Sequence, residues 1–167
     1  MKAGNHAAFT LLEAQATDLD ALRGLMRRYQ TWTQIDLCFQ HFEAELAALP
    51  GAYVKPRGNL WIARRTSDQE PLGCIAVKPL NDAECEMKRL WVEDAAKGMG
   101  VGRALAQTSV DFARAAGYRT MKLDTLRTRM PAAISLYRSL GFEETDAYVH
   151  NPEPDVLYMA LQLVETQ

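Results

Sequence analysis

Apolar and polar positions alternate along this chain with two different periods. Apolar side chains recur every three or four residues in four stretches, which predicts helices over residues 19–29, 40–48, 101–116 and 131–140. A period of two, bounded by turn-forming residues, predicts seven strands over residues 7–13, 60–64, 72–80, 84–92, 118–124, 142–145 and 156–163. The order of these elements predicts one α/β (α+β) domain over residues 7–165 behind a flexible N-terminus at 1–6. Its sheet is expected to be mixed and mostly antiparallel, with six to seven strands flanked by about four helices.

The strand predicted over residues 84–92 carries charge in its first half and apolar groups in its second. Strict alternation would place two sets of side chains on opposite faces of the strand. One set is Glu84, Glu86, Lys88, Leu90 and Val92, and the other is Cys85, Met87, Arg89 and Trp91. Glu86 and Val92 are then expected on the same face, three alternations apart.

Composition limits the class of protein. The chain has 167 residues, enough for one domain with a sizeable core, and 48% of them are hydrophobic. A net charge of −2 gives no basic field that would favour nucleic acid, and no apolar run is long enough to span a membrane. Residues 1–9 lack the apolar core of a signal peptide, so we expect a cytoplasmic protein. The three cysteines and three histidines are scattered, and no metal site is expected.

A glycine-rich stretch at residues 97–105 separates a predicted strand from a predicted helix. Gly98, Gly100 and Gly102 alternate there between Lys97 and Arg103. Glycine permits positive φ and close approach of a ligand, and the following helix offers free N–H groups and the positive end of its dipole. Such a turn binds phosphate, and the plain alternative is a loop that only reverses the chain. The spacing fits neither the dinucleotide fingerprint, whose third glycine would fall at position 103, nor a P-loop closed by Gly-Lys-Ser/Thr.

Four pieces stand in order along the chain: the strand at 86–92, the glycine turn at 97–102, the strand at 121–125 and the helix at 131–140. The turn reads Lys-Gly-Met-Gly-Val-Gly, and residues 136–142 read Leu-Tyr-Arg-Ser-Leu-Gly-Phe. Together these pieces resemble the GCN5-related N-acetyltransferase (GNAT) superfamily. Its loop signature is Arg/Gln-x-x-Gly-x-Gly/Ala, met here with lysine in the first slot, and its closing signature Leu-Tyr-x-x-Leu-Gly-Phe is complete. The resemblance covers nearly the whole chain and implies a GNAT-like fold and an acetyltransferase.

Further segments look like a bacterial GNAT subgroup of unassigned substrate. They are Asp36-Leu37, Gln40, Glu45-Leu46, residues 49–51, 86–90 and 123–126, Tyr148 and Asn151-Pro152. The resemblance also implies a possible homodimer, because dimers are a frequent oligomeric state in the superfamily.

The resemblance implies a site for acetyl-CoA around the glycine turn. Backbone N–H groups of residues 99–103 would hold its pyrophosphate. The preceding strand would splay from its neighbour, so that the acetyl-pantetheine arm inserts there, and backbone groups of Leu90 and Val92 would polarise the thioester carbonyl. An asparagine that often opens the last family helix is replaced here by Arg129 or Met130. The implied cofactor-binding residues are Leu90, Trp91, Val92, Lys97, Gly98, Met99, Gly100, Val101, Gly102, Arg103 and Ala133.

The implied reaction is attack of an amine on a thioester, which uses a base and an acid. A lysine-like amine has a pKa of about 10.4 and must lose a proton, directly or through a water. Glu86 matches by position the general-base glutamate of the family's histone acetyltransferases, with Glu84 in reserve; the plain alternative is a strand glutamate paired with Lys88. Tyr137 matches the tyrosine that protonates the leaving thiolate, and is otherwise a core tyrosine. Cys85 is not expected to act as a nucleophile, because it faces away from Glu86 and has no histidine nearby in sequence.

The acceptor amine is expected to meet two segments rich in aromatic and polar groups, residues 29–40 and 148–155. Asp36 could attract an ammonium group, and Trp32 or Tyr148 could stack on a cation, although all three are equally typical of packing. The candidate acceptor residues are Tyr29, Trp32, Asp36, Tyr148 and Asn151. The expected function is acetyl transfer from acetyl-CoA to a primary amine of a small molecule or peptide in a ternary complex. The alternative is a non-catalytic acyl-CoA-binding sensor or interaction module, which would keep the glycine loop without needing Glu86 or Tyr137.

Overall fold

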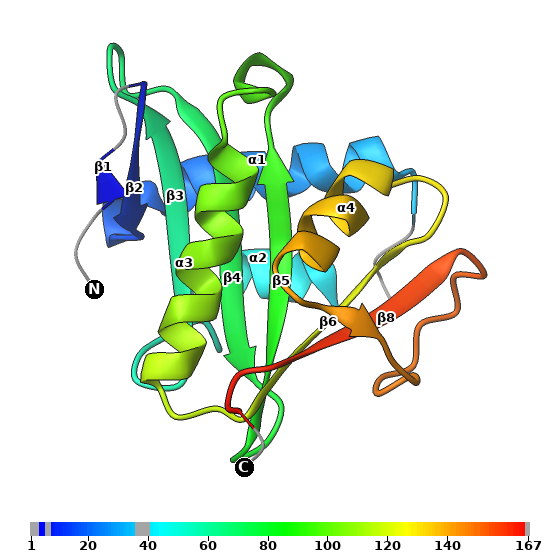
Figure 1. Cartoon of the computed structure of the whole chain (residues 1–167). Coiled ribbons are helices and arrows are strands. Elements are labelled where there is room, and N and C mark those ends of the chain that lie inside the picture. Colours follow the sequence, from blue (N-terminus) through cyan, green and yellow to red (C-terminus); the bar gives the residue numbers. More distant parts are fainter. Residues whose placement is uncertain (1–3, 6–7, 36–40, 166–167) are drawn as a thin grey trace.

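The computed structural model describes residues 4–5, 8–35 and 41–165. Over these residues the chain forms one sheet of eight strands with α-helices on both faces (Figure 1). The strands are β1 (Gly4–Asn5), β2 (Phe9–Glu13), β3 (Asn59–Arg65), β4 (Pro71–Pro79), β5 (Glu84–Val92), β6 (Thr120–Leu126), β7 (Glu143–Glu144) and β8 (Val156–Gln162). The α-helices are α1 (Leu19–Thr33), α2 (Phe42–Ala48), α3 (Val101–Ala115) and α4 (Pro131–Ser139).

The sheet opens between its two central strands. Strand order is β1-β2-β3-β4-β5-β6-β8-β7, and every neighbouring pair is antiparallel except β5 and β6, which are parallel. β5 and β6 pair at three positions only, from Glu84–Thr120 to Glu86–Lys122. Beyond Glu86 the two strands diverge, and Figure 1 shows β6 and β8 slanting away from the rest of the sheet.

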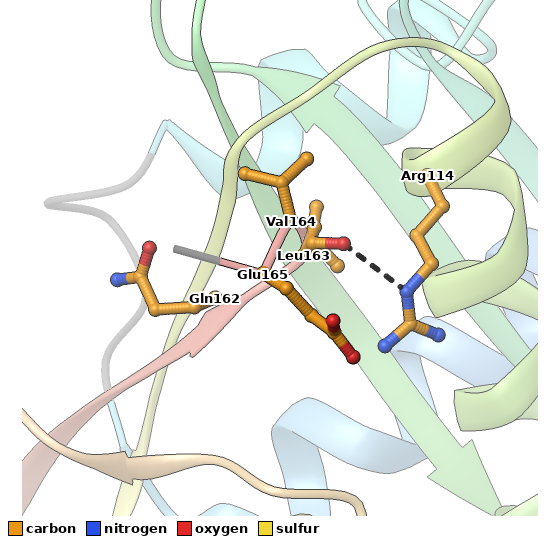
Figure 2. A pocket seen from close by; sticks show the side chains of 5 residues that line it. All are labelled: Arg114, Gln162, Leu163, Val164 and Glu165. Atoms are coloured by element: carbon orange, nitrogen blue, oxygen red, sulfur yellow. Dashed lines mark hydrogen bonds between the residues drawn. The ribbon is translucent and has the colours of Figure 1, made fainter. Parts of the chain in front are cut away.

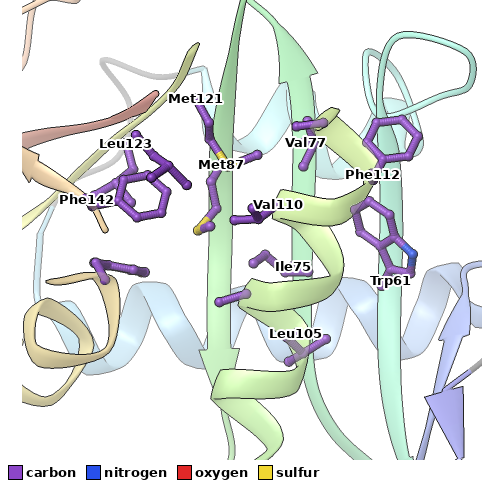
Figure 3. Close-up of a cluster of buried hydrophobic side chains, with 14 of the residues drawn as sticks. Trp61, Ile75, Val77, Met87, Leu105, Val110, Phe112, Met121, Leu123 and Phe142 are labelled. Atoms are coloured by element: carbon purple, nitrogen blue, oxygen red, sulfur yellow. The ribbon is translucent and has the colours of Figure 1, made fainter. Parts of the chain in front are cut away.

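Two hydrophobic cores lie on opposite faces of the sheet. The first lies under α3 and α4, where Leu105 and Val110 of α3 pack toward Ile75 and Met87 of the sheet (Figure 3). The second lies under α1 and α2, and its helical members include Leu22, Leu25, Met26, Phe42 and Leu46. Each helix therefore buries the apolar side that its helical spacing predicts.

The predicted α/β, mostly antiparallel fold class is confirmed. The sheet has eight strands rather than six or seven because the two residues of β1 are also paired, with β2; β7 is the short strand predicted over residues 142–145. Gly4 and Asn5 pair with β2 inside the segment expected to be a flexible N-terminus, and the rest of residues 1–6 lies outside the described residues. The domain boundaries at 7 and 165 stay a prediction.

Helix α1 is one turn longer than predicted. It continues to Thr33 and ends where Gln34 takes a left-handed conformation with a φ of 56°. Trp32, expected beyond the end of the helix, therefore lies on it together with Tyr29. The rings of Tyr29 and Trp32 pack 6.0 and 5.8 Å from the ring of Trp91, and this tertiary packing extends the helix despite the modest helix propensity of aromatic residues.

The predicted alternation of β5 is wrong beyond Lys88. Arg89 has a φ of 61°, and the register with β4 shifts beside it: Ala76 lies opposite Lys88, whereas Cys74 lies opposite Trp91. Two residues of β5 thus face one residue of β4, which is a β-bulge.

This bulge, centred on Arg89, reverses the faces of the strand's second half. Leu90 and Val92 pack against the core under α3 and α4, while Trp91 packs against the core under α1 and α2. Glu86 and Val92 therefore lie on opposite faces, contrary to expectation, and Glu86 shares its face with Trp91.

Candidate active site

The glycine turn between β5 and α3 can bind an anion. Gly98 and Gly100 have φ values of +83° and +82°, a conformation that residues with side chains rarely adopt, and Gly100 is the N-cap of α3. The first backbone hydrogen bond of the helix runs from the Ala104 N–H to the Gly100 carbonyl at 3.0 Å. The N–H groups of residues 101–103 precede that bond, and the positive end of the helix dipole points the same way.

A cavity of about 490 Å³ lies beside this turn. Its walls come from both faces of the sheet: from α1, from the end of β5 with the glycine turn, and from the start of α4. Eleven of the predicted site residues line it: Tyr29, Trp32, Leu90, Trp91, Val92, Lys97, Gly98, Gly100, Val101, Gly102 and Ala133. Because the cavity reaches the part of β5 that no longer pairs with β6, it joins the anion-binding turn to the opening in the sheet.

Two predicted cofactor-binding residues lie outside this cavity. The Met99 N–H donates to the Ala96 carbonyl at 3.2 Å, and the Met99 side chain packs against the core under α3. Its amide is already engaged within the turn, which corrects the expectation that it holds pyrophosphate. The Arg103 side chain turns instead to α4, where Nη2 donates to Ser139 Oγ at 3.1 Å.

From the wall that α4 and the residues before it contribute, the sequence predicts only Ala133 as a cofactor-binding residue. The cavity is also lined by Arg129, Met130, Pro131, Ala132 and Leu136, and by Ala96 at the glycine turn. Pro131 is the residue by which the sequence marks the start of this helix, because proline favours the first turn of a helix. That this helix would begin opposite the glycine turn depends on the tertiary fold and has no local signature.

Glu86 lies at the vertex of the opening, as the last residue of β5 that pairs with β6. It is 2% exposed, and its Oε2 accepts a hydrogen bond of 2.6 Å from the Tyr148 hydroxyl. The Nζ atoms of Lys78 and Lys88 lie 3.7 and 3.8 Å from Oε1. The structure thus joins two predicted site residues, Glu86 and Tyr148. The pairing with Lys88 that is expected for a structural glutamate is present as well.

The groups around Glu86 are tuned by burial. Burial and the neighbouring Glu86 carboxylate raise the pKa of Tyr148, so its hydroxyl remains a proton donor. Burial lowers the pKa of Lys88, and the charge of Glu86 opposes that shift. Glu84, the reserve base, is engaged elsewhere, with its Oε2 2.9 Å from Lys122 Nζ.

Tyr137 lies on α4, one turn beyond Ala133, with its ring 5.8 Å from the ring of Phe142. Burial raises the pKa of its hydroxyl, and Tyr29 and Asp124 act in the same direction. Tyr29 comes from α1 on the other face of the sheet. The Tyr137 hydroxyl therefore stays protonated and has a proton to donate.

The acceptor candidates form two groups beside the opening. Tyr29 and Trp32 line the cavity from α1, and Trp32 is 43% exposed. Tyr148 and Asn151 come from the segment between β7 and β8, where Asn151 Nδ2 donates to Asp124 Oδ2 at 3.1 Å. Asp36 lies outside the described residues.

A second concavity lies at the opposite end of α3 (Figure 2). It has a volume of about 670 Å³ and is lined by Arg114, Gln162, Leu163, Val164 and Glu165. Arg114 Nε donates to the Leu163 carbonyl there at 3.4 Å. Although larger, this concavity contains none of the predicted site residues, and about 20 Å of helix separates it from the glycine turn.

Cys85 is buried on the α3 face, away from Glu86, and burial raises the pKa of its thiol to about 12. A protonated thiol is a poor nucleophile, as expected for this residue. Within residues 4–5, 8–35 and 41–165, no three His, Cys, Asp or Glu side chains gather as ligands of a metal would. None of the helices that the structure describes is both long and apolar enough to cross a membrane.

Comparison with known proteins agrees with this geometry. The model of the Acetyltransferase (GNAT) family matches residues 19–142. An uncharacterized N-acetyltransferase of Schizosaccharomyces pombe is 40% identical over 147 residues, which cover 87% of this chain and 89% of that protein. Two solved structures are similar in fold. A GNAT acetyltransferase from Staphylococcus aureus has a TM-score of 0.78 at 18% identity and covers 94% of this chain and 100% of its own. The protein yncA of Salmonella typhimurium, solved with its cofactor acetyl-CoA, has a TM-score of 0.67 at 21% identity, over 95% and 96% of the two chains.

The yeast relative is eukaryotic, so the predicted assignment to a bacterial subgroup is not supported. The family match spans most of the chain, and the yeast relative is aligned over most of both proteins. The chain therefore belongs to the Acetyltransferase (GNAT) family and is an acyltransferase.

Proposed function

We propose that this acyltransferase moves the acetyl group of acetyl-CoA to a primary amine of a small molecule or peptide, by direct attack within a ternary complex. The observation that carries the proposal is the shared cavity of about 490 Å³, which joins the anion-binding glycine turn to the opening between β5 and β6. A donor lying along it has its pyrophosphate at the turn and its thioester at the opening. The Salmonella structure with acetyl-CoA supports this choice of donor.

The chain binds the donor mainly through its backbone. The N–H groups of residues 101–103 and the dipole of α3 hold the pyrophosphate. Beyond Glu86, β5 has no β6 partner in the described pairing, so backbone groups of Leu90 and Val92 can bind the acetyl-pantetheine arm. A backbone N–H aimed at the thioester oxygen stabilises the negative charge that develops there during attack.

Once the ammonium has lost its first proton to solvent, attack by the neutral amine requires one further proton to leave the nitrogen and one to reach the sulfur. Glu86 is 2% exposed and lies beneath Tyr148, so we infer a route through the Tyr148 hydroxyl. The amine proton moves to the Tyr148 oxygen while the Tyr148 proton moves to Glu86 Oε2. The nitrogen forms the new C–N bond, the C–S bond breaks, and the sulfur takes the hydroxyl proton of Tyr137. Solvent then returns a proton to Tyr137 and removes one from Glu86.

Release of the CoA thiol from acetyl-CoA, measured over a panel of amines, amino acids, aminoglycosides and peptides, tests this proposal. We expect turnover with at least one acceptor, and thermal stabilisation by acetyl-CoA alone. Glu86→Gln should lower kcat, because the amide cannot take the amine proton. Glu84→Gln is the matched control on the same strand face and should leave kcat near the wild-type value. Binding of acetyl-CoA without thiol release to any acceptor would support the acyl-CoA sensor instead.

A further inference from the structure

Arg89 has a backbone conformation that strands rarely contain. Its φ is 61°. In the described part of the chain, the other non-glycine residues with positive φ are Gln34, His41 and Gln69. Those three lie at the ends of α1 and α2 or in the turn between β3 and β4, whereas Arg89 lies inside β5. A residue persists in such a conformation only where its surroundings hold it there.

Several contacts hold Arg89 in place. Its Nε and Nη2 donate to the two carboxylate oxygens of Glu45 in α2, at 2.9 and 3.0 Å. The guanidinium carbon lies 5.0 Å from the centre of the Phe42 ring. The Cys74 thiol donates to the Arg89 carbonyl, with Sγ 3.3 Å from the oxygen. Arg89 is 6% exposed, so its guanidinium is withdrawn from water, while Glu45 is partly buried.

Both partners of the ion pair keep their charge. Burial alone would raise the pKa of Glu45, but the hydrogen bond and charge of Arg89 outweigh it, and the pKa is lowered. Burial would likewise lower the pKa of Arg89, and Glu45 outweighs it. A bidentate pair of this kind fixes the orientation of the arginine as well as its position.

The bulge decides which way the end of β5 faces. A shift of one residue in a strand moves every following side chain to the other face. With the bulge, Leu90 and Val92 face the core under α3 and α4 and line the cavity, while Trp91 faces α1. Without it, these three residues would exchange faces, and their N–H and C=O groups would be displaced along the opening.

We propose that Arg89 and Glu45 form a positioning pair, through which α2 holds the bulge of β5 and thereby places the backbone of Leu90 and Val92 against the acetyl-pantetheine arm. This inference rests on the proposed function, which assigns the arm to that backbone. Neither Arg89 nor Glu45 belongs to the described lining of the cavity, so the pair acts through its neighbours.

The test separates the backbone conformation of Arg89 from its side chain. Arg89→Gly and Arg89→Ala are each made together with Glu45→Gln, so that no unpaired charge is left in the interior. Both double variants lack the ion pair, but only glycine adopts a φ near 61° without strain. We expect kcat to be at least about tenfold lower with alanine than with glycine, while the two KM values for acetyl-CoA agree within about threefold. Equal kcat values in the two double variants would overturn the proposal, because the backbone conformation would not matter. An Arg89→Gly double variant as active as the wild type would also overturn it, because the ion pair would not be needed.

A matched control uses a second bidentate pair that contacts α2, formed between α1 and α2. Arg27 Nη1 and Nη2 donate to Glu43 of α2 at 2.9 and 3.2 Å, but both side chains are exposed. Arg27→Ala with Glu43→Gln removes another bidentate Arg–Glu pair of α2 without touching β5. Its kcat should stay within about twofold of the wild type, since exposed pairs contribute little. If its kcat falls as far as that of the Arg89→Ala double variant, the effect comes from a displaced α2 rather than from the bulge, which would contradict the proposal.

Hydrogen exchange of the amides in residues 87–92 tests the positioning without any substrate. In folded protein, exchange should be faster in the Arg89→Ala double variant than in the Arg89→Gly one; equal exchange rates would overturn the positioning role. If the alanine variant does not fold, Arg89→Asn replaces it, because asparagine tolerates positive φ better than alanine but less well than glycine. A wild-type protein that neither binds acetyl-CoA nor releases thiol would refute the proposed function. The exchange rates would still show whether the conformation of Arg89 holds the bulge in place.

Discussion

Two glycines in nearly the same conformation allow the glycine turn to be tested with a matched pair of substitutions. Gly100 and Gly117 have φ values of +82° and +88°, and a Cβ added at either would meet nothing within 4 Å. Alanine therefore introduces no clash at either position, only the cost of a left-handed backbone, about 1–2 kcal/mol. For a chain of this length, 1 kcal/mol corresponds to about 2–4 °C in Tm. Both variants should therefore melt about 2–8 °C below the wild type and close to each other.

The two variants should differ in their response to acetyl-CoA. Gly100 lines the cavity at the start of α3, whereas Gly117 follows the other end of that helix. A strained Gly100→Ala turn no longer aims all its N–H groups at the pyrophosphate. The loss of one hydrogen bond to a charged group, about 1.5–3 kcal/mol, weakens binding by about tenfold or more.

The assay is thermal denaturation with and without acetyl-CoA at 100 times the wild-type Kd. Ligand at that concentration stabilises the wild type by about 2.7 kcal/mol, or about 5–11 °C. Gly117→Ala should show the same ligand shift, and Gly100→Ala, with a tenfold higher Kd, only about 3–6 °C. Equal ligand shifts in the two variants would refute the assignment of the glycine turn to the pyrophosphate. Unequal losses of Tm without ligand would refute the premise that strain alone is being compared.

Three further predictions concern the remaining titratable groups. Tyr137→Phe should lower kcat by about 100-fold, because the leaving thiolate loses its proton donor, with an unchanged thermal shift by acetyl-CoA; a kcat within about twofold of the wild type would exclude that role. Cys85→Ala should leave acetyl transfer unchanged, and the folded protein should resist iodoacetamide at Cys85 at pH 8, because burial raises the pKa of that thiol to about 12. Glu45 has a folded-state pKa below its ordinary 4.5, because the hydrogen bond and charge of Arg89 outweigh burial. The ionised Glu45 therefore stabilises the folded protein fully above pH 4.5, and this stabilisation is lost as the pH falls through the lowered pKa. Glu45→Gln should therefore lose less Tm than the wild type between pH 6 and pH 3, and parallel Tm curves would contradict that linkage.

Periodicity in the sequence predicts elements best where one face of the element meets a core. The strand expected at residues 84–92 is observed as Glu84–Val92, and the last strand is observed as Val156–Gln162. The end of α1 escapes such a pattern. Its last turn is helical because Tyr29 and Trp32 pack on Trp91 of β5, a contact that no local propensity contains.

The bulge of β5 has no local signal for a similar reason. Arginine is not a residue that favours positive φ, so nothing at position 89 marks the change of face. The conformation depends on a pairing with Glu45, 44 positions earlier in the chain. The hydrogen bond from Tyr148 to Glu86 likewise spans 62 positions. The sequence names both residues as candidates, but only the tertiary fold brings them together.

The placement of Glu86 and Tyr137 on opposite faces of the sheet bears directly on the proposed transfer. Direct attack needs a group that accepts a proton at nitrogen and another that donates one at sulfur, so a single titrating side chain cannot do both at once. Glu86 shares its face with Lys88, which lies opposite a residue of the core under α1 and α2, whereas Tyr137 belongs to the core under α4. The opening between β5 and β6 lets both faces reach one carbonyl.

The bulge completes this division of the site. It turns the Leu90 and Val92 side chains toward α3 and α4, away from Glu86. Tyr148, Tyr29 and Trp32 then line the side of the opening where Glu86 lies. We therefore expect the donor to enter along α3 and α4, and the acceptor along α1 and the segment before β8. Substitutions of Trp32 should then change KM for the acceptor more than KM for acetyl-CoA, and the reverse result would place the acceptor on the α4 side.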